Sequence, residues 1–293
     1  MEIEGKKKMK RLFSVVCVFF MLIVMCGCTN ATNVETNDEP TNNDTQEKMV
    51  YRIGMECDYA PNNWQEDTAS DTNLPISNLD GFYAEGYDIQ MSKLIAEELD
   101  CEIEIVKLAW SGLIQALKEG QIDMIIAGMG DTPERKESIA FSNTYSTKKT
   151  EYVLVVRSDS EYVNATSIQD FSGATVVGQV NTYYDSAIDQ IEGVNHAPAA
   201  VDVPNMNSKL QEGLVDAIVL DDETADAMYA DDSDYTVLAF EGDDGFVVEM
   251  TGACVGIRLE DTDLVEQVNT ALANISKETR VQLMEEAKAR QPK

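Results

Sequence analysis

The residue types that support covalent catalysis are scarce in this sequence. Its only histidine is His196, so no nucleophile can be matched with an imidazole base, and neither a G-x-S-x-G elbow nor a phosphate-cradling G-x-x-x-x-G-K is present. The cysteines never occur as C-x-x-C, a common zinc spacing. The turn-like surroundings of His196 predict a solvated loop residue. The sequence therefore favours binding over catalysis, and we expect no metal and no cofactor.

Two charged residues are of types that could hold a small charged molecule. The planar guanidinium of Arg135 can donate two parallel hydrogen bonds to a carboxylate. Taken alone, its neighbours Glu134 and Glu137 favour the simpler interpretation of ordinary ion pairs on a surface helix. Asp221 follows the apolar run at 217–220, where a carboxylate either faces a ligand at the end of a strand or begins the next helix.

The segments that precede Arg135 alternate between the patterns of strands and helices. Strands are predicted at residues 50–55, 102–108 and 122–127, and amphipathic helices at 88–99 and 111–118. This alternation predicts a parallel sheet flanked by helices.

A second set of elements follows residues 151–157, which we interpret as a hinge-like extended segment. It has strands at 174–177 and 217–220 and helices at 182–191 and 205–211. The last strand, near 255–259, and the helices at 263–273 and 277–288 have no sheet of their own, so we expect them to return to the first lobe.

The predicted fold class is therefore α/β with two lobes, each a mostly parallel sheet flanked by helices, joined by a two-stranded hinge. Lobe 1 is expected at 49–150 and 252–293, and lobe 2 at 151–251, with hinge crossings near 150 and 251. Ligands of such folds bind at the carboxyl ends of strands that face the cleft.

The N-terminal segment predicts export. Basic residues between Lys6 and Arg11 precede an apolar run at 12–25, which is too short to span a bilayer and is typical of a signal peptide over residues 1–27. Gly27 before Cys28 resembles a lipobox, so Cys28 is the expected lipidation site. Residues 28–48 are polar and are expected to form a disordered tether. Whether translation starts at Met1 or Met9 stays open.

The charge balance excludes one class of partner. The formal net charge is −31, which repels phosphate backbones, so no nucleic acid is expected to bind. In the predicted folded part only Cys57, Cys101 and Cys254 remain, an odd number that allows at most one disulfide. The sequence leaves open whether that disulfide forms.

A long run of residues resembles the type II periplasmic binding proteins that serve polar amino-acid ABC transporters. The run begins Trp-Ser-Gly-Leu-Ile-Gln-Ala-Leu-Lys-Glu-Gly-Gln-Ile-Asp at 110–123 and continues through 127–135 to Ile-Ala-Phe-Ser at 139–142. Shorter matching pieces lie at 58–61, 86–89, 179–182 and 213–217, the last leading to Asp221. The resemblance extends from about residue 50 to the end of the sequence.

This resemblance implies a site for the two charged groups of a free amino acid. Arg135 is expected to bind the ligand carboxylate, with Asn181 and Thr182 at a helix start completing its cage, and Asp221 to bind the ammonium. Gly128 and Gly130 contribute backbone groups. Two positions depart from the family, because Gly130 stands where serine or threonine is frequent and Asn181 where glycine is frequent.

The resemblance also implies how the ligand side chain is held. Tyr59 and Trp110 correspond to aromatic walls, and Glu56 to an acid that reaches the distal group of cationic ligands, so a polar or cationic amino acid is expected. Core packing is the alternative for Trp110. If Glu56 instead faces solvent, Asn63 or Gln179 lines the pocket and a neutral amide ligand fits better.

The expected function is that of a receptor outside the cell membrane that delivers an amino acid to the permease and ATPase of an ABC importer. We expect a monomer anchored to the membrane by its lipid and without enzymatic activity. One alternative is an enzyme on the same fold, such as a prephenate or arogenate dehydratase. Another is the receptor domain of a sensor, which is less favoured because no second apolar segment occurs in the sequence. The particular amino acid, and whether the cell has one membrane or two, stay open.

Overall fold

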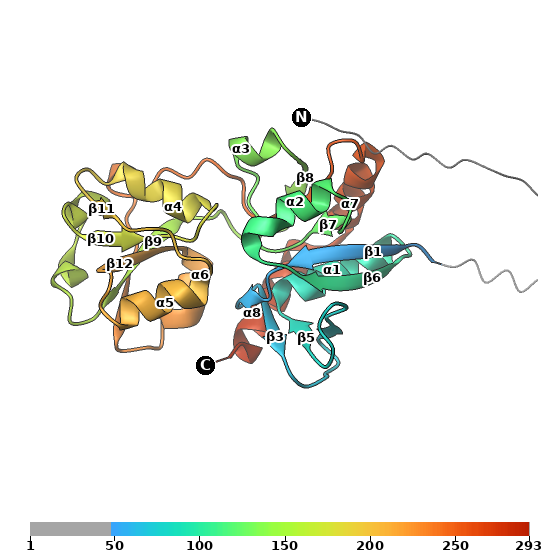
Figure 1. The fold of residues 1–293 in the computed structure, drawn as a ribbon, viewed down its shortest axis with the longest axis horizontal. Helices are drawn as coiled ribbons and strands as arrows, with labels where there is room; N and C mark the ends of the chain where they lie inside the picture. The colour runs from blue at the N-terminus through green and yellow to red at the C-terminus, as the bar shows by residue number, and fades with distance from the viewer. Residues whose placement is uncertain (1–47, 293) are drawn as a thin grey trace, which may run out of the picture. The chain divides into compact units, whose positions relative to one another are not determined.

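The computed structural model describes residues 48–292, so the predicted signal peptide, Cys28 and most of the predicted tether lie outside the described residues. The first of two five-stranded sheets has the order β6-β1-β7-β14-β8 (Figure 1). Its strands are β1 (Val50–Met55), β6 (Glu102–Lys107), β7 (Met124–Ile125), β8 (Ala140–Thr144) and β14 (Cys254–Ile257). Only β14 runs against the others, and its pairing with β7 and β8 confirms the predicted return of the chain to the first sheet.

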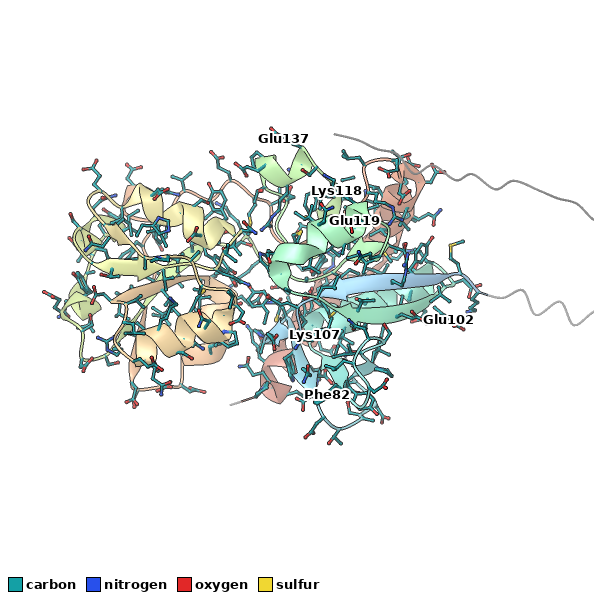
Figure 2. The ribbon with its side chains drawn as sticks, viewed as in Figure 1. Phe82, Glu102, Lys107, Lys118, Glu119 and Glu137 are labelled. Carbon is teal, nitrogen blue, oxygen red and sulfur yellow. The ribbon has the colours of Figure 1, made fainter. Side chains whose placement is uncertain are left out.

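Four helices of this lobe bury apolar positions: α1 (Tyr87–Glu98), α2 (Leu113–Lys118) after the 3-10 turn Trp110–Gly112, α7 (Thr262–Asn274) and α8 (Lys277–Arg290). The one-turn helix α3 (Pro133–Lys136) buries no residue. In α1, Ile89 and Ile95 are fully buried in one core with Ile53 and Ile105 of the sheet. Glu102 and Lys107, labelled in Figure 2, are the first and last residues of the edge strand β6.

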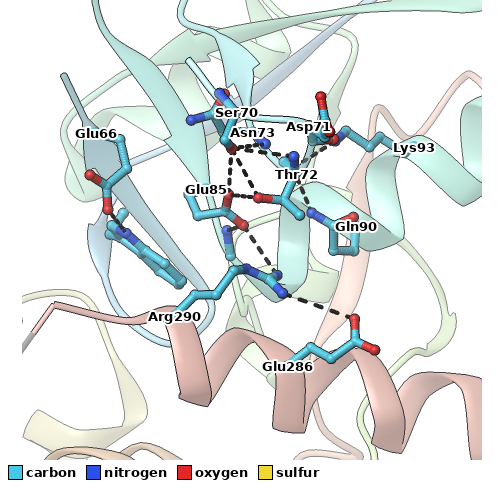
Figure 3. Close-up of polar contacts among 12 residues, drawn as sticks. Glu66, Ser70, Asp71, Thr72, Asn73, Glu85, Gln90, Lys93, Glu286 and Arg290 are labelled. Atoms are coloured by element: carbon cyan, nitrogen blue, oxygen red, sulfur yellow. Dashed lines mark hydrogen bonds and ion pairs between the residues drawn. The ribbon is translucent and has the colours of Figure 1, made fainter. Parts of the chain in front are cut away.

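A small antiparallel sheet that the sequence did not reveal lies between β1 and α1 in the chain. Its order is β2 (Asp58–Tyr59), β3 (Asn63–Glu66), β5 (Tyr83–Glu85) and β4 (Leu74–Pro75). Glu85 ties this sheet to the C-terminal helix, because its carboxylate accepts hydrogen bonds from Ser70 and Thr72 and lies 3.3 Å from the guanidinium of Arg290 (Figure 3). Glu85 is buried and the Arg290 side chain is partly exposed, so this part-buried ion pair links α8 to the small sheet.

The second sheet has the order β11-β10-β12-β9-β13. Its strands are β9 (Tyr152–Arg157), β10 (Thr175–Val177), β11 (Asn195–His196), β12 (Ala217–Asp221) and β13 (Tyr235–Leu238), with β9 reversed. The helices are α4 (Tyr183–Ala187), α5 (Val203–Gln211) and α6 (Asp222–Tyr229), and 3-10 turns occur at Glu161–Asn164, Ile168–Phe171, Ile188–Gln190 and Gly242–Asp244.

The interpretation of residues 151–157 as a hinge-like segment is wrong. Tyr152–Arg157 is strand β9, bonded on both sides, to β12 and to β13. A continuous apolar run, Tyr-Val-Leu-Val-Val, suits a strand that is buried on both faces, and this is where the run is found.

Two short segments connect the sheets, one between β8 and β9 and one before β14. They are joined to each other by hydrogen bonds rather than by a regular strand ladder: the Tyr145 amide donates to the Ala253 carbonyl at 2.9 Å, and the Ala253 amide donates to the Ser146 hydroxyl at 2.7 Å. Cys57, Cys101 and Cys254 are all free thiols, which answers the open question about a disulfide. Within residues 48–292, every helix is too short or too polar to cross a bilayer.

Candidate ligand-binding site

A pocket, here called the ligand pocket, lies among residues of both lobes. It encloses about 360 Å³ of empty space, part of it open to solvent. Eight of the ten residues predicted to bind ligand line it: Glu56, Tyr59, Trp110, Gly128, Gly130, Arg135, Gln179 and Thr182. Asn181 and Asp221 do not line it, but each is bonded to residues that do.

Arg135 is positioned by the short helix α3. Thr132 caps this helix through a hydrogen bond from the Arg135 amide, and Pro133 supplies the preset φ of a first helical residue. The guanidinium donates to the Gly130 carbonyl at 2.8 Å and to the Asn181 carbonyl at 2.9 Å, across the lobes. It also lies over the Trp110 ring, 5.1 Å from the centroid. Burial lowers the pKa of Arg135, but an arginine stays charged at any physiological pH.

Asn181 and Thr182 occupy a turn before α4. Asn181 has a φ of 58°, in the left-handed region where asparagine and glycine are the residues best tolerated, which explains why it can stand in place of a glycine. The Trp110 indole also donates to its carbonyl, at 3.3 Å. The Thr182 hydroxyl and amide both donate to the Gln179 carbonyl, at 2.7 and 3.2 Å, so these two groups hold the turn together.

Glu56 and Gln179 meet across the lobes. The Gln179 amide donates to the Glu56 carboxyl at 3.1 Å, and the two residues are only 2% and 4% exposed, respectively. Burial raises the pKa of Glu56 to about 8, while the hydrogen bond from Gln179 opposes this shift. Glu56 is therefore mostly protonated at neutral pH, and it faces the ligand pocket rather than solvent.

Asp221 receives its hydrogen bonds from two tyrosines of different lobes. The Tyr59 hydroxyl donates to Asp221 Oδ2 at 2.6 Å and the Tyr184 hydroxyl to the same oxygen at 2.7 Å. Each phenol has one proton, so both protons point to the carboxylate, although the two hydroxyl oxygens are only 2.8 Å apart. The other carboxylate oxygen caps α6 through the Thr224 amide at 2.9 Å. Burial, followed by the Asp221 charge, raises the pKa of both tyrosines.

A second cavity, here called the hinge-side cavity, shares Tyr59, Gly128, Tyr184 and Met250 with the ligand pocket. Asp221 lines this second cavity together with residues of the segment that leads from β8 to β9. Tyr59 and Tyr184 thus lie between the ligand pocket, which Arg135 lines, and the hinge-side cavity, which Asp221 lines.

Sequence reasoning missed four residues that line the ligand pocket: Tyr152, Tyr183, Tyr184 and Met250. Tyr184 lies in the first turn of α4, three residues after Asn181, and this proximity was the only available signal. Asn63 was the alternative lining residue for the case that Glu56 faces solvent, and it does not line the pocket. Its side chain bonds the Cys57 amide and Asp88, both at 2.8 Å, and it lines neither cavity.

The two glycines of the pocket have different reasons to be glycine. Gly128 has a φ of +62°, and a Cβ there would lie 2.7 Å from the Tyr59 ring. Gly130 has an ordinary backbone, but a Cβ there would lie 2.1 Å from Met250 Sδ. Met250 therefore occupies the space that a serine or threonine side chain at position 130 would need.

The arrangement is suited to binding a molecule that carries both a negative and a positive group. Burial raises the pKa of Cys57 to about 12 and of Cys254 to about 11, so neither thiol supplies a nucleophile at neutral pH. In the part of the chain that the structure describes, no three side chains are grouped to hold a metal ion. Two α/β lobes joined by two crossings, with an arginine and carboxylates between them, define a solute-binding protein of the cleft type.

The chain belongs to the bacterial extracellular solute-binding proteins, family 3, whose model matches residues 51–287. The predicted family is thereby confirmed, and it is a family of binding proteins found outside the cytoplasm. This favours the binding interpretation over the dehydratase alternative.

Curated relatives and solved structures agree with this assignment. The arginine-binding extracellular protein ArtP of Bacillus subtilis is 25% identical over 278 residues, which are 91% of each chain. A probable histidine-binding protein of Campylobacter jejuni is 27% identical over 81% of this chain and 84% of its own. The crystal structure of a mutant ArgBP from T. maritima superposes with a TM-score of 0.67 at 29% identity, over 82% of this chain and 96% of that one.

Proposed function

We propose that this chain is the receptor of an amino-acid ABC importer, which captures a free amino acid in the ligand pocket and delivers it to a membrane permease driven by an ATPase. The observation that carries the proposal is the placement of Arg135 and Asp221, from different lobes, at two adjoining cavities that Tyr59 and Tyr184 both line. A zwitterion presents one charge to each of these residues, and its burial is tolerable only when both charges are matched.

Arg135 is the proposed partner of the ligand carboxylate. Its two donors now reach backbone carbonyls of Gly130 and Asn181, and a carboxylate would be a stronger acceptor for them. The Trp110 ring holds the guanidinium from one side, so we assign Trp110 a positioning role in addition to its place in the pocket wall. Asn181 and Thr182 lie at the same end of the pocket. The backbone atoms of Gly128 and Gly130 line the pocket as well.

The proposed ligand side chain is cationic, with arginine and histidine ahead of glutamine and cystine. Glu56 and Gln179 lie at the pocket wall, and Tyr59, Tyr152 and Tyr184 add aromatic surface near them. A cationic side chain would lower the pKa of Glu56 and pair with its carboxylate, whereas an aliphatic one would leave Glu56 with Gln179 as its only partner and no opposite charge. Relatives that bind arginine and histidine support this choice.

Binding is tested by thermal shift and calorimetry on residues 49–293 against the twenty common amino acids. A ligand at 100 times its Kd adds about 2.7 kcal/mol to the free energy of unfolding, which is a clear shift in Tm. We expect L-arginine or L-histidine to give the largest shift. A protein that binds no amino acid would remove the receptor proposal, and one that prefers leucine or valine would remove only the cationic ligand.

We further propose that lobe 1 comprises 49–150 with 252–293 and lobe 2 comprises 151–251, closing as a monomer about crossings near 150 and 251. Lipidation of Cys28 would anchor the protein outside the membrane. Metabolic labelling with a fatty acid tests this anchor: the label is expected on the wild type and not on Cys28→Ser, and equal labelling of both would contradict it.

A further inference from the structure

Asp88 is a fully buried carboxylate that the site described above does not use. It is the second residue of α1 and is 0% exposed, and within residues 48–292 no lysine or arginine pairs with it. The Tyr145 hydroxyl donates to its Oδ1 at 2.7 Å, and the Asn63 amide donates to its Oδ2 at 2.8 Å. A buried carboxylate without a cation costs free energy, so its partners show what it holds in place.

The Tyr145 hydroxyl joins Asp88 to the ligand pocket. The Gly128 amide donates to this hydroxyl at 3.0 Å, and because the single phenol proton goes to Asp88, the oxygen is left as an acceptor for that amide. Gly128 lines the ligand pocket, and its φ of +62° is one that glycine adopts and leaves easily. The hydrogen bond from its amide therefore fixes a piece of pocket backbone that has no side chain to hold it.

The backbone of Tyr145 belongs to the hinge. Tyr145 directly follows β8, in the first of the two segments that connect the sheets. Its amide donates to the Ala253 carbonyl of the other segment at 2.9 Å, and its carbonyl accepts from the Tyr87 hydroxyl of α1 at 2.6 Å. A bend of the crossings that moves Tyr145 therefore acts on the Gly128 amide as well.

Asn63 extends the link to a second part of the pocket wall. Its side-chain nitrogen donates to Asp88, and its side-chain oxygen accepts from the Cys57 amide at 2.8 Å. Cys57 has a φ of 54°, a conformation that costs a non-glycine residue free energy and persists only where neighbours hold it. Cys57 directly follows Glu56, which lines the ligand pocket. The Asp88 network, as it is called below, consists of Cys57, Asn63, Asp88, Gly128 and Tyr145.

The charge of Asp88 keeps this network paired. Burial raises the pKa of Asp88 to about 6, while hydrogen bonds from Tyr145 and Asn63 and the nearby Gly128 amide oppose the shift, so Asp88 is mostly ionised at pH 7.5. The other titratable groups beside it are Tyr87, Tyr145 and Cys57, and burial raises the pKa of each, so they stay neutral between pH 5 and pH 7.5.

Protonation of Asp88 would disturb the network. It adds a donor to a buried group whose four hydrogen bonds already match each donor with an acceptor, so at least one of these bonds must break. Neither Asp88 nor Tyr145 lines the ligand pocket or the hinge-side cavity. Any effect of these two residues on binding therefore acts through the backbone that they hold.

We propose that Asp88 is a positioning residue for ligand binding, which holds the Gly128 backbone in its binding geometry through the Tyr145 hydroxyl and links that backbone to the hinge. This inference rests on the proposed function, because it concerns how the amino-acid pocket is kept ready for its ligand. A backbone that is fixed before binding loses less freedom when the ligand enters. Loss of the link thus weakens binding although no group that lines the pocket is removed.

The test measures the Kd of L-arginine and L-histidine by calorimetry on the wild type and on Tyr145→Phe. Phenylalanine keeps the buried ring and removes only the hydroxyl that joins Asp88 to the Gly128 amide. At pH 7.5 the Kd should rise by about threefold to tenfold, the usual net value of one hydrogen bond. At pH 5 the two proteins should differ by less than about twofold, because protonation of Asp88 has already broken the link in the wild type. Titration of Glu56 cancels in this comparison, since both proteins carry it.

Asp88→Asn provides a second arm. An amide brings donors where the network needs an acceptor, so the variant should bind as weakly as Tyr145→Phe at pH 7.5. Adding Tyr145→Phe to it should then have no further effect on Kd, because both changes break the same link. If Asp88→Asn does not fold, the pH series on Tyr145→Phe decides alone.

Ser92→Ala is the matched control. Ser92 lies one turn further along α1, is 0% exposed, and donates its hydroxyl to the main-chain carbonyl of Asp88 at 2.7 Å. Its loss removes a buried hydrogen bond but leaves the Asp88 carboxylate untouched, so Tm should fall while Kd stays within about twofold. Amide exchange without ligand should be at least about tenfold faster at Gly128 in Tyr145→Phe than in Ser92→Ala.

The outcomes are distinct. An unchanged Kd in Tyr145→Phe, a loss of equal size at pH 5 and pH 7.5, or the same loss in Ser92→Ala would each overturn the positioning role of Asp88 while the receptor proposal stands. A wild type that binds no amino acid would contradict the receptor proposal itself and, with it, this inference.

Discussion

Gln179 of the second lobe donates a hydrogen bond to the carboxyl of Glu56 in the first lobe, with a donor–acceptor distance of 3.1 Å, and both residues are buried. The same pattern recurs at Tyr59 with Asp221 and at Arg135 with the Asn181 carbonyl. The polar residues of the site therefore bond one another across the lobes. A ligand that enters between them must offer better partners than these, which makes charge matching decisive for affinity.

Glu56 should make binding of L-arginine depend on pH. Its pKa of about 8 leaves the carboxyl mostly neutral at pH 6.5, and a guanidinium favours the ionised form. Affinity is therefore expected to rise between pH 6.5 and 8.5, by up to about tenfold per pH unit, with release of a proton. Calorimetry in buffers of different ionisation enthalpy measures this release. Glu56→Gln should flatten the dependence, and an unchanged slope in that variant would rule out Glu56 as its source.

Arg135 should be required for binding. Replacing it with alanine leaves the ligand carboxylate buried without a cation, at a cost of about 3 to 5 kcal/mol. Arg135→Lys should recover little, because an ammonium cannot copy the two parallel donors. The matched control is Lys136→Ala, next in the chain, which removes a half-exposed lysine that pairs with Asp131. Affinity of Arg135→Ala within a few-fold of the wild type would exclude Arg135 from the site.

Much of the fold was predictable because its signals are local. Strand β1 was predicted with both bounds correct, and α1 and β6 to within a residue at each end, since apolar spacing sets them. Strand β9 was misread as a hinge segment because its neighbours β12 and β13 lie some 60 to 85 residues later in the chain. The short strands of the small sheet carry two to four residues each, too few for a period to show.

The site was predictable only where a motif marks it. Arg135 was found through the run that ends with it, although its type alone favoured a surface residue. Tyr184 and Met250 lie outside any motif and reach the pocket through tertiary packing. Asn62 and Asn63 are adjacent and identical in type, so only the backbone direction decides which one bonds inside the lobe and which one faces a cavity.

His196 should stabilise the fold at low pH. It lies in edge strand β11, where its ring nitrogens are 3.0 Å from Asp185 and 2.9 Å from Asp189. Burial lowers its pKa, but the hydrogen bonds and charges of the two carboxylates outweigh burial, so the pKa is raised. The stabilisation is then complete below the unfolded pKa of about 6.5 and is lost as pH rises through the folded pKa. The Tm difference between wild type and His196→Asn should be larger at pH 5.5 than at pH 8.5, and an equal difference at both would show that protonation plays no part.

Gly130 and Met250 should behave as a coupled pair. A serine at position 130 would place its Cβ 2.1 Å from Met250 Sδ, and this sulfur also accepts a hydrogen bond from the Tyr152 hydroxyl at 3.4 Å, which limits its freedom to move. Gly130→Ser alone should therefore cost about 1 to 3 kcal/mol in the free energy of unfolding through overpacking.

Met250→Ala should remove most of the penalty of the serine. The double variant Gly130→Ser with Met250→Ala is expected to be more stable than the sum of the single changes by about 1 to 3 kcal/mol, measured by urea unfolding. Gly112→Ser is the matched control, because a Cβ at Gly112 meets no atom within 4 Å and its backbone is not left-handed. It should be near neutral and should not couple to Met250→Ala. Strict additivity of the Gly130 and Met250 changes would mean that the methionine does not occupy the space that the glycine leaves.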